Sequence, residues 1–449
     1  MVMVSAENGT PVLNVLYGQL LRRGVQYFLP SSHLDILGPD QESTSEITFQ
    51  RATEDGLSFA WLGERYKLVN GRRFSDHEQK MVWSIVRFLS ARYNLLFDSE
   101  IATRSSTIFS GLPEDRYVSA FLDASVFKDP MSVANRPDRI SEAIDVLRIS
   151  ALSSYEDKRI STGALLFGSF PDACHSLPPE PADALPYSSD LTSIRSFHRI
   201  CDGLRTIALV DRRGFMVELV DVQEWARPFS QIELPVPSAR RYRMHCQATL
   251  CGGHLCLVLT PNGEIKIFGE GVQLFSFLDG RWHLTDAVSK YEAWESAIGH
   301  KDLSSRLFSA ALNLAEQRRG GMFVVLEDQQ DVRQLVRGLD LLESDRPERT
   351  GAKNQLHYLL RRQLVTKLSP MVLESIAQID GSVVLDHDSN LLAFGAILRH
   401  RAPMDQDEDV GEGGRTAAAI SASQFGAVLM VSEGGQLSFY QKGHCTWTL

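Results

Sequence analysis

The stretch IDGSVVLD, residues 379–386, decides the fold of the C-terminal third of this 449-residue chain. An aspartate and a glycine stand directly before a short apolar run that is typical of a buried strand. Upstream, Ser369 and Pro370 are the expected N-cap and first residue of a helix predicted over 370–378. Asp380 and Gly381 are therefore expected at a helix-to-strand junction, where a glycine lets a ligand approach the backbone closely.

Helical and strand patterns alternate on both sides of this junction. Residues 303–318 are amphipathic, and the glycine pair that follows them is the expected end of a helix. The other predicted helices are 354–368 and 370–378, and the predicted strands are 322–326, 382–386, 391–396, 427–432 and 436–440. This alternation predicts an α/β domain over 301–449, with a mixed sheet flanked by helices.

The first part of the chain has a different pattern. An α+β domain is predicted over 1–170, with a helix at 76–94 whose start is capped by Ser75 and Glu78 in the spacing of a capping box. Five prolines then predict a stiff linker over 171–190, because proline fixes φ and donates no ladder hydrogen bond.

A β-rich domain is predicted after this linker, over 191–300. Short apolar runs divided by Gly, Asn and Asp are typical of strands and hairpin turns. We expect an antiparallel meander without helices, and its predicted strands are 204–210, 215–220, 255–259, 265–268, 273–277 and 281–284.

Composition excludes several classes of protein. The formal net charge of -10 argues against nucleic acid as a partner, because phosphate binding needs a basic face. No window reaches the roughly 18 to 20 apolar residues of a membrane span, and the first ten residues do not have the pattern of a secretory signal. We therefore expect a soluble, cytoplasmic, multidomain protein that does not insert in a membrane. Phosphate-binding P-loop, dinucleotide-binding, zinc-protease and serine-hydrolase motifs are all absent from the sequence.

One cluster of metal-ligand residue types lies within twelve residues of sequence: His245, Cys246, Cys251, His254 and Cys256. Structural zinc sites usually pair their ligands at regular knuckle spacings, which this cluster does not have. Cys256 also falls in the predicted strand LCLVL, where a small thiol packs well. Packing is the favoured interpretation, and metal binding is the alternative.

A second metal-like pattern is Asp386-His387-Asp388, which follows the Gly381-Ser382 pair. Nucleotidyltransferases of the polymerase-β type use Gly-Ser and Asp-x-Asp to hold two metal ions, but at a longer spacing. Asp and Asn are also turn-forming residues, so DHDSN is interpreted as the turn of a hairpin.

The segment GGRTAAAI, residues 413–420, predicts an anion site. It runs from an acidic, glycine-rich stretch into a helix of small residues. Free amides at a helix start, together with the helix dipole, favour phosphate, and an arginine can grip phosphate with two hydrogen bonds. With Asp380 as a carboxylate for a divalent metal, these are the groups that phosphoryl or nucleotidyl transfer requires. The structural alternative is a helix end, a loop and a solvated arginine.

In order and spacing, these elements resemble the diadenylate cyclase family, whose catalytic domain makes cyclic di-AMP from two ATP molecules. The family's Asp-Gly-Ala motif is similar to Asp380-Gly381-Ser382, and its Gly-Thr-Arg-His-Arg-Ala-Ala motif is similar to GGRTAAA at 413–419. A Val-Ser-Glu sequence is matched at 431–433, and the resemblance extends over about 302–443. The chain also resembles bacterial cyclases that place a long sensor-like region ahead of the catalytic domain.

The resemblance implies a role for each matched residue. Asp380 would hold the catalytic Mg²⁺ or Mn²⁺, and Glu433 would complete the metal or ribose environment. The nucleotide would be lined by Gly381 and Ser382. The triphosphate would be contacted by Gly413, Gly414, Arg415 and Thr416. Two domains, each with one ATP, would meet face to face, so a homodimer or higher assembly is implied. The region before residue 300 would regulate the reaction in response to a signal ligand that the sequence does not identify.

The motif also departs from the family. Arg-His-Arg becomes Arg415-Thr416-Ala417, so one arginine and the histidine are missing. Loss of a charge-assisted phosphate contact costs roughly 1.5 to 3 kcal/mol. Arg399 and Arg401 are nearby in sequence and are candidates to supply the missing charge. The alternative to an active cyclase is a nucleotide-binding regulator that keeps the fold and has lost turnover.

Overall fold

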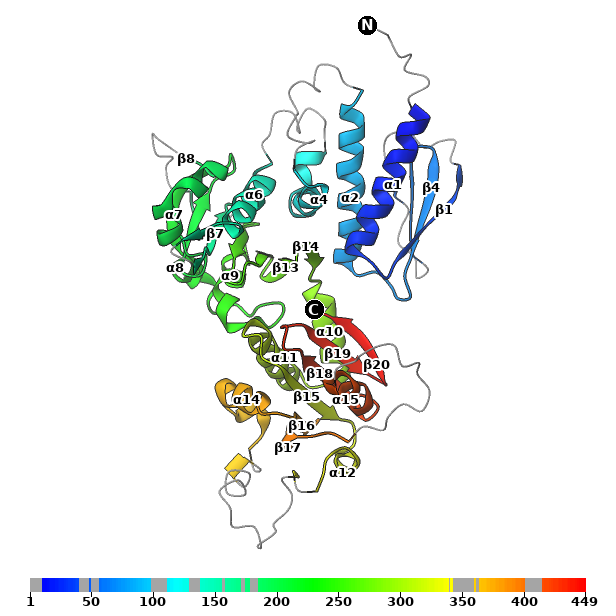
Figure 1. Cartoon of the computed structure of the whole chain (residues 1–449), viewed down its shortest axis with the longest axis vertical. Coiled ribbons are helices and arrows are strands. Elements are labelled where there is room, and N and C mark those ends of the chain that lie inside the picture. The colour runs from blue at the N-terminus through cyan, green and yellow to red at the C-terminus, as the bar shows by residue number, and fades with distance from the viewer. Residues whose placement is uncertain are drawn as a thin grey trace. The chain divides into compact units, whose positions relative to one another are not determined.

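The computed structural model of the chain describes residues 10–39, 48–49, 56–97, 111–128, 138–155, 158–170, 174–177, 185–338, 340–341, 359–360, 363–399 and 414–449. The chain forms two compact units, each assembled from separate stretches of sequence (Figure 1). The first unit contains residues 1–231 and 247–286, and the second contains 232–246 and 287–449. The predicted division at 170, 190 and 300 stays a prediction.

The described part of the first unit contains two larger sheets and a separate two-stranded one. Of the two larger sheets, the smaller has the order β1-β4-β3-β2 and is antiparallel throughout. Its strands are β1 (His33–Pro39), β2 (Thr48–Phe49), β3 (Leu57–Trp61) and β4 (Glu64–Val69). The larger sheet has the order β14-β13-β12-β11-β7-β9-β10-β8. Its strands are β7 (Thr162–Leu166), β8 (Leu185–Pro186), β9 (Thr206–Val210), β10 (Phe215–Asp221), β11 (Leu255–Leu259), β12 (Ile265–Gly269), β13 (Val272–Leu278) and β14 (Arg281–Leu284).

The larger sheet joins sequence from both sides of the predicted proline-rich linker. Strand β7 precedes the linker and pairs in parallel with β9 and antiparallel with β11, both of which follow it. Within the linker, 174–177 and 185–190 are described, and β8 pairs with β10 there. The remaining linker residues lie outside the described part of the chain.

The helices of the first unit follow from local capping and apolar patterns. The predicted helix at 76–94 is confirmed as α2 (Asp76–Leu95), and its Ser75–Glu78 capping box is formed. The other helices are α1 (Thr10–Phe28), α4 (Pro113–Leu122), η1 (Ala124–Phe127), α6 (Arg139–Ala151), η2 (Ser189–Ser193), α7 (Arg195–Ile200), α8 (Val222–Ala226) and η3 (Arg227–Phe229), and a separate two-stranded sheet is formed by β5 (Ser154–Tyr155) and β6 (Lys158–Arg159).

The predicted helix-free meander is correct in part. Strands β11 to β14 are consecutive and antiparallel, as expected. However, α8 follows β10 directly, and α9 (Arg243–Ala248) with the turn η4 (Arg240–Tyr242) lies before β11. Asp221 caps α8 by accepting hydrogen bonds from the backbone N–H groups of Gln223 and Glu224, which explains why the strand ends there.

The second unit is built on a six-stranded mixed sheet of order β17-β16-β15-β18-β19-β20. Strands β15 and β16 are parallel, and the other neighbours are antiparallel. The strands are β15 (Gly321–Leu326), β16 (Ser382–Asp386), β17 (Leu391–Ala396), β18 (Gly426–Val431), β19 (Leu437–Gln441) and β20 (His444–Thr448). The predicted mixed sheet is confirmed.

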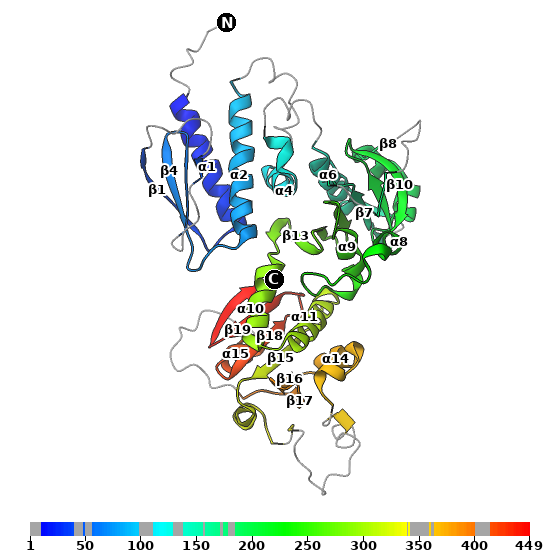
Figure 2. The ribbon, with the colours of Figure 1, turned by 180° about the vertical axis from the view of Figure 1, so that it is seen from behind.

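Helices cover both faces of this sheet, as Figures 1 and 2 show from opposite sides. Alternate side chains of β15, β16 and β18 form a buried cluster with α12 (Val332–Leu335) and α15 (Gly414–Ala422). The other face is covered by α10 (Ala287–Ile298), α11 (Lys301–Glu316) and α14 (Pro370–Ala377). On this face Trp294 of α10 packs edge-on against Phe439. The described part of the unit also contains the short turns η5 (Gln329–Asp331) and η6 (Val365–Lys367).

The predicted helix 354–368 is wrong over its last residues. Residues 351–358 lie outside the described part of the chain, so the first half of this prediction is not described. Leu364 forms an antiparallel bridge with Asn390, and 365–367 form the single turn η6. A backbone partner distant in sequence has replaced the local helical hydrogen bonds. None of the helices that the structure describes is both long and apolar enough to cross a membrane.

Candidate nucleotide-binding site

The sheet topology of the second unit brings the predicted site segments to one edge. Parallel strands β15 and β16 both begin at this edge, and their antiparallel neighbours β17 and β18 both end there. Gly321 pairs with Val431, and Ser382 pairs with Ala396. The Asp380 motif directly before β16 and Glu433 directly after β18 therefore lie at the same edge. We call it the site edge.

Helix α15 brings Arg415 to the site edge. The helix runs into β18 after a short turn, so its first residues lie near the end of that strand. Arg415 Nη1 is 3.6 Å from Glu433 Oε1. A Cβ atom added to Gly320 would lie 2.2 Å from the same Nη1, so the guanidinium rests on the backbone just before β15. Glycine at position 320 thus leaves room for the guanidinium of Arg415 as it lies here, a contact that the sequence pattern did not reveal.

Asp380 has the chemistry of an available carboxylate. It is exposed, and within the described part of the chain its side chain makes no hydrogen bond or ion pair. Gly381 next to it has a φ of 120°, and a Cβ there would lie 2.5 Å from the carbonyl carbon of Gly395. This close approach of two backbones requires glycine and fixes the direction in which the chain enters β16.

The remaining predicted site residues differ in their surroundings. Ser382 is buried, and its hydroxyl donates to Met322 Sδ at 3.5 Å, so it is used inside the sheet. Gly414 opens α15, and a Cβ added there would meet no atom within 4 Å. Thr416 is half-buried two residues further along the helix. Gly413 lies outside the described residues, as does Arg401. The contacts predicted for these residues with a nucleotide stay predictions.

Arg399 lies beyond the end of β17, which is the strand that ends beside Ser382 at the site edge. Its side chain is exposed, and its backbone N–H donates to the carbonyl of Leu335 at 2.8 Å. Arg399 therefore stays a candidate, predicted from the sequence, to compensate for the arginine missing from the motif at 415–417.

The donor set at the site edge fits a divalent cation that is shared with phosphate. Mg²⁺ is commonly held by one or two carboxylates together with substrate phosphates and water, rather than by a complete protein cage. Asp380 provides one exposed carboxylate of this kind. Glu433 is 83% exposed and is paired with Arg415, so that pair would have to open for Glu433 to serve as a ligand. Among the described residues, no group of three or more metal-ligand side chains is assembled.

The two other metal-like patterns have structural explanations. Asp386 is buried, and its two carboxylate oxygens accept from the backbone N–H and side-chain amide of Asn390, each at 2.9 Å. The predicted hairpin turn is thereby confirmed. Burial raises the pKa of the Cys246 thiol to about 12, which disfavours the thiolate that binds metal. His254 Nδ1 accepts from the backbone N–H of Gly168, and Cys256 is buried within β11.

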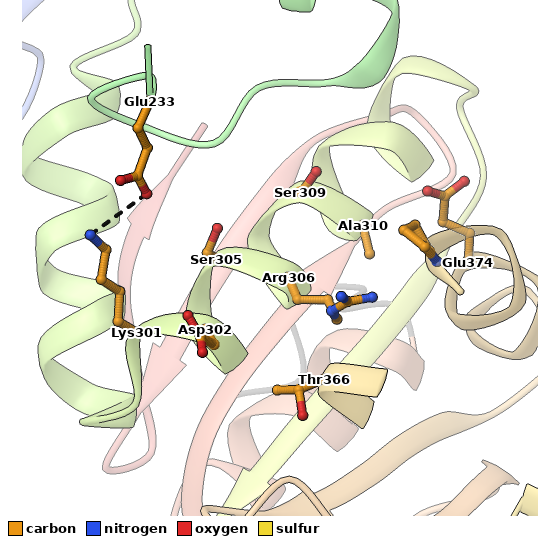
Figure 3. A pocket seen from close by; sticks show the side chains of 10 residues that line it. Glu233, Lys301, Asp302, Ser305, Arg306, Ser309, Ala310, Thr366 and Glu374 are labelled. Carbon is orange, nitrogen blue, oxygen red and sulfur yellow. Dashed lines mark ion pairs between the residues drawn. The ribbon is translucent and has the colours of Figure 1, made fainter. Parts of the chain in front are cut away.

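A separate cavity of about 390 Å³ lies along α11 and α14 (Figure 3). Its lining includes Lys301 and Arg306 from the first half of α11 and Thr366 from η6. Glu374 of α14 and Glu233 of the segment 232–246 also face it. Helix α11 reaches the site edge only beyond its last residue, so this cavity is distinct from the site edge.

The second unit is a mixed-sheet α/β domain. At one edge of its sheet lie the start of a helix, an arginine and an exposed carboxylate. A comparison with known protein families also points to a nucleotide-binding domain. Residues 309–445 match the model of the family described as DAC, DisA bacterial checkpoint controller nucleotide-binding. The predicted family resemblance is confirmed for these residues.

Comparisons with individual proteins gave only weak similarities. A search of curated proteins found no match to this chain. One similar solved structure is a hypothetical membrane spanning protein from Bacillus cereus, with 23% identity over 32% of this chain and a TM-score of 0.24. This chain spans 62% of that structure's length. Another is a double mutant of DacA from Staphylococcus aureus, with 16% identity, covering 34% of this chain and 87% of that one, at a TM-score of 0.21.

Proposed function

We propose that this protein is a diadenylate-cyclase-like nucleotidyltransferase that condenses two ATP molecules to cyclic di-AMP. The observation that supports the proposal is that the Arg415–Glu433 pair and the start of β16, which Asp380 precedes, lie at the same sheet edge, in residues that match a nucleotide-binding family. These residues come from three separate segments, and carboxylate, arginine and helix start are the groups that triphosphate chemistry uses.

In this proposal each residue binds or orients one part of the substrate. Arg415 and the amides at the start of α15, near Gly414 and Thr416, bind the triphosphate. Asp380 holds Mg²⁺ or Mn²⁺ and orients the attacking 3′-hydroxyl, with Glu433 as a second carboxylate nearby. The divalent cation, when bound, neutralises charge that develops on the phosphoryl oxygens. Gly381 keeps side-chain bulk away from the nucleotide.

The reaction requires two copies of the domain. The 3′-oxygen of each ATP attacks the α-phosphorus of the other, so two P–O bonds form and two P–O bonds to pyrophosphate break. Two pyrophosphates leave, and each 3′-hydroxyl loses its proton. Because one domain binds one ATP, two domains must face each other, and we propose a homodimer or higher assembly. ATP as substrate is in keeping with a cytoplasmic location.

The second candidate function is nucleotide binding without turnover. It is favoured by the sequence Arg415-Thr416-Ala417, which lacks one arginine and the histidine of the family motif. Under the first proposal Arg399 supplies the missing charge. Under the second, ATP binds at the site edge and the first unit responds to it as part of a regulatory protein.

Product analysis separates these two functions. Purified full-length protein is incubated with ATP and Mn²⁺ or Mg²⁺, and products are identified by mass spectrometry beside an Asp380→Asn variant. Cyclic di-AMP from the wild type, reduced at least about 100-fold in the variant, supports the cyclase. ATP binding without product supports the regulator. Neither binding nor product would contradict both.

A further inference from the structure

Three segments of the second unit are joined by a closed set of hydrogen bonds. The backbone N–H of Arg240 donates to Asn313 Oδ1 at 2.7 Å, and Asn313 Nδ2 donates to Glu374 Oε1 at 2.7 Å. Arg240 Nη2 donates to the same Glu374 oxygen, also at 2.7 Å. We call these three residues the clamp. They connect the segment 232–246 with α11 and α14.

The clamp depends on its buried carboxylate. Glu374 is 5% exposed and Asn313 is 7% exposed, whereas the Arg240 side chain is half exposed. A buried carboxylate is costly unless it is paired, and within the described part of the chain Arg240 is its ion-pair partner. Loss of Arg240 therefore leaves this carboxylate with one neutral donor and removes the ion pair that holds α14 to the segment 232–246.

Helix α14 leads directly into the Asp380 motif. Four residues separate its last residue, Ala377, from the first residue of β16. The backbone N–H of Gln378 donates to the carbonyl of Glu374, so the last helical turn starts from the clamp residue itself. Gly381 is fixed against β17 at one end of this connection, and α14 holds the other end. A shift of α14 therefore changes the backbone of residues 378–380, which include Asp380.

The segment 232–246 has an unusual place in the chain. It packs with the second unit, yet residues of the first unit precede and follow it in sequence. Both ends of the segment that carries Arg240 are therefore covalently joined to the first unit. The cavity of Figure 3 lies between Glu233 of this segment and the helices α11 and α14, so the space beside the clamp is not filled.

We propose that Glu374 is a positioning residue for Asp380, and that the segment 232–246 sets its position through Arg240. The clamp is then the route by which the first unit controls nucleotidyl transfer. This inference rests on the proposed function, and its experiment is arranged so that the two can fail separately.

The test measures kcat and KM for ATP in the full-length chain. Arg240→Ala and Glu374→Ala, which each remove a hydrogen-bonding group of the clamp, are expected to lower kcat about ten- to hundredfold, because small misplacements of reacting groups have effects of this size. KM should change little, since triphosphate binding by Arg415 is retained. Arg240→Lys should restore part of the loss. The double variant should lose no more than the stronger single variant, because both act through one contact.

Lys301→Ala is the matched control. Lys301 also pairs with the segment 232–246, through Glu233 at 3.6 Å, but both side chains are mostly exposed and neither contributes to the clamp. This variant should keep the wild-type kcat. An equal loss in Lys301→Ala, or unchanged kcat in Arg240→Ala, would overturn the proposal.

Hydrogen–deuterium exchange provides a readout that does not depend on turnover. In Arg240→Ala, exchange should rise in peptides covering 370–382 and stay unchanged in β11. If wild-type protein makes no product, the proposed function fails, and this exchange still decides whether the clamp holds α14. Exchange that rises equally in β11 would show general destabilisation and would contradict the proposal.

Discussion

The two ends of β16 each carry an aspartate, and the two aspartates have opposite surroundings. Asp386, at the end of the strand, is buried and has both oxygens occupied by Asn390. Asp380, two residues before the strand, is exposed and has no partner among the described residues. The comparison teaches that residue type alone does not show whether a carboxylate is available to a ligand. The occupancy of its oxygens does.

The largest expected effect is on kcat, and it tests the difference between Asp380 and Asp386. Asp380→Asn should reduce kcat at least about 100-fold, because it removes the charge at the site edge without removing a structural contact. Asp386→Asn should keep kcat within about twofold of wild type, since its oxygen still accepts from the Asn390 backbone. Steady-state assays with ATP measure both. Equal losses in the two variants would remove the functional distinction between the two ends.

The next effect concerns Gly381, which lies beside Asp380 just before β16. Gly381→Ala places a Cβ 2.5 Å from the backbone of Gly395 at a φ of 120°, and should lower the free energy of unfolding by at least about 1–3 kcal/mol. Gly414→Ala is the control, because a Cβ there meets no atom within 4 Å. It should change stability by less than about 0.5 kcal/mol. Urea unfolding of both variants measures the two free energies of unfolding. Equal losses in the two variants would show that the Cβ clash is not the reason why glycine is needed at position 381.

At the structural end, Asp386→Ala should lower the free energy of unfolding by about 1–2 kcal/mol. It removes both acceptors of Asn390, and part of this loss is recovered by water because Asn390 is exposed. Asp388→Ala, in the same turn but exposed, should have almost no effect. A large loss in Asp388→Ala would mean that the whole turn, rather than one carboxylate, stabilises the hairpin.

The smallest expected effect is that of Glu433→Gln on stability. Its ion pair with Arg415 is 3.6 Å long and largely exposed, and pairs of this kind contribute about 0–1 kcal/mol. The melting temperature should therefore stay close to that of wild type. A marked loss of stability would show that Glu433 resembles Asp386 rather than Asp380.

Elements fixed by local pattern were predictable from the sequence. Strands β11, β14, β16 and β17 have the predicted residues, because apolar runs end at turn-forming residues. The helix predicted to reach residue 368 was wrong, since Leu364 bridges to Asn390 instead. Hydrophobic spacing alone cannot reveal such a partner, because the competing hydrogen bonds come from a distant strand.

The site was predictable where its residues form contiguous motifs. Asp380 and Arg415 were found in this way, although their functional roles stay predictions. The sequence indicates Gly320 only as a helix end, because its contact with Arg415 depends on the folded sheet. The clamp gave no sequence signal either, since Arg240 is 73 residues from Asn313 and 134 residues from Glu374.

Because the second unit is built from two separate stretches of sequence, recombination within the gene can separate residues that contact one another in the fold. A genetic crossover placed just before α10 would transfer the complete sheet to a new partner but leave Arg240 behind. The transferred gene segment would then encode Glu374 without its cation. The two units should therefore be passed on together, and recombination within this gene should be tolerated only where the new N-terminal region supplies an equivalent arginine.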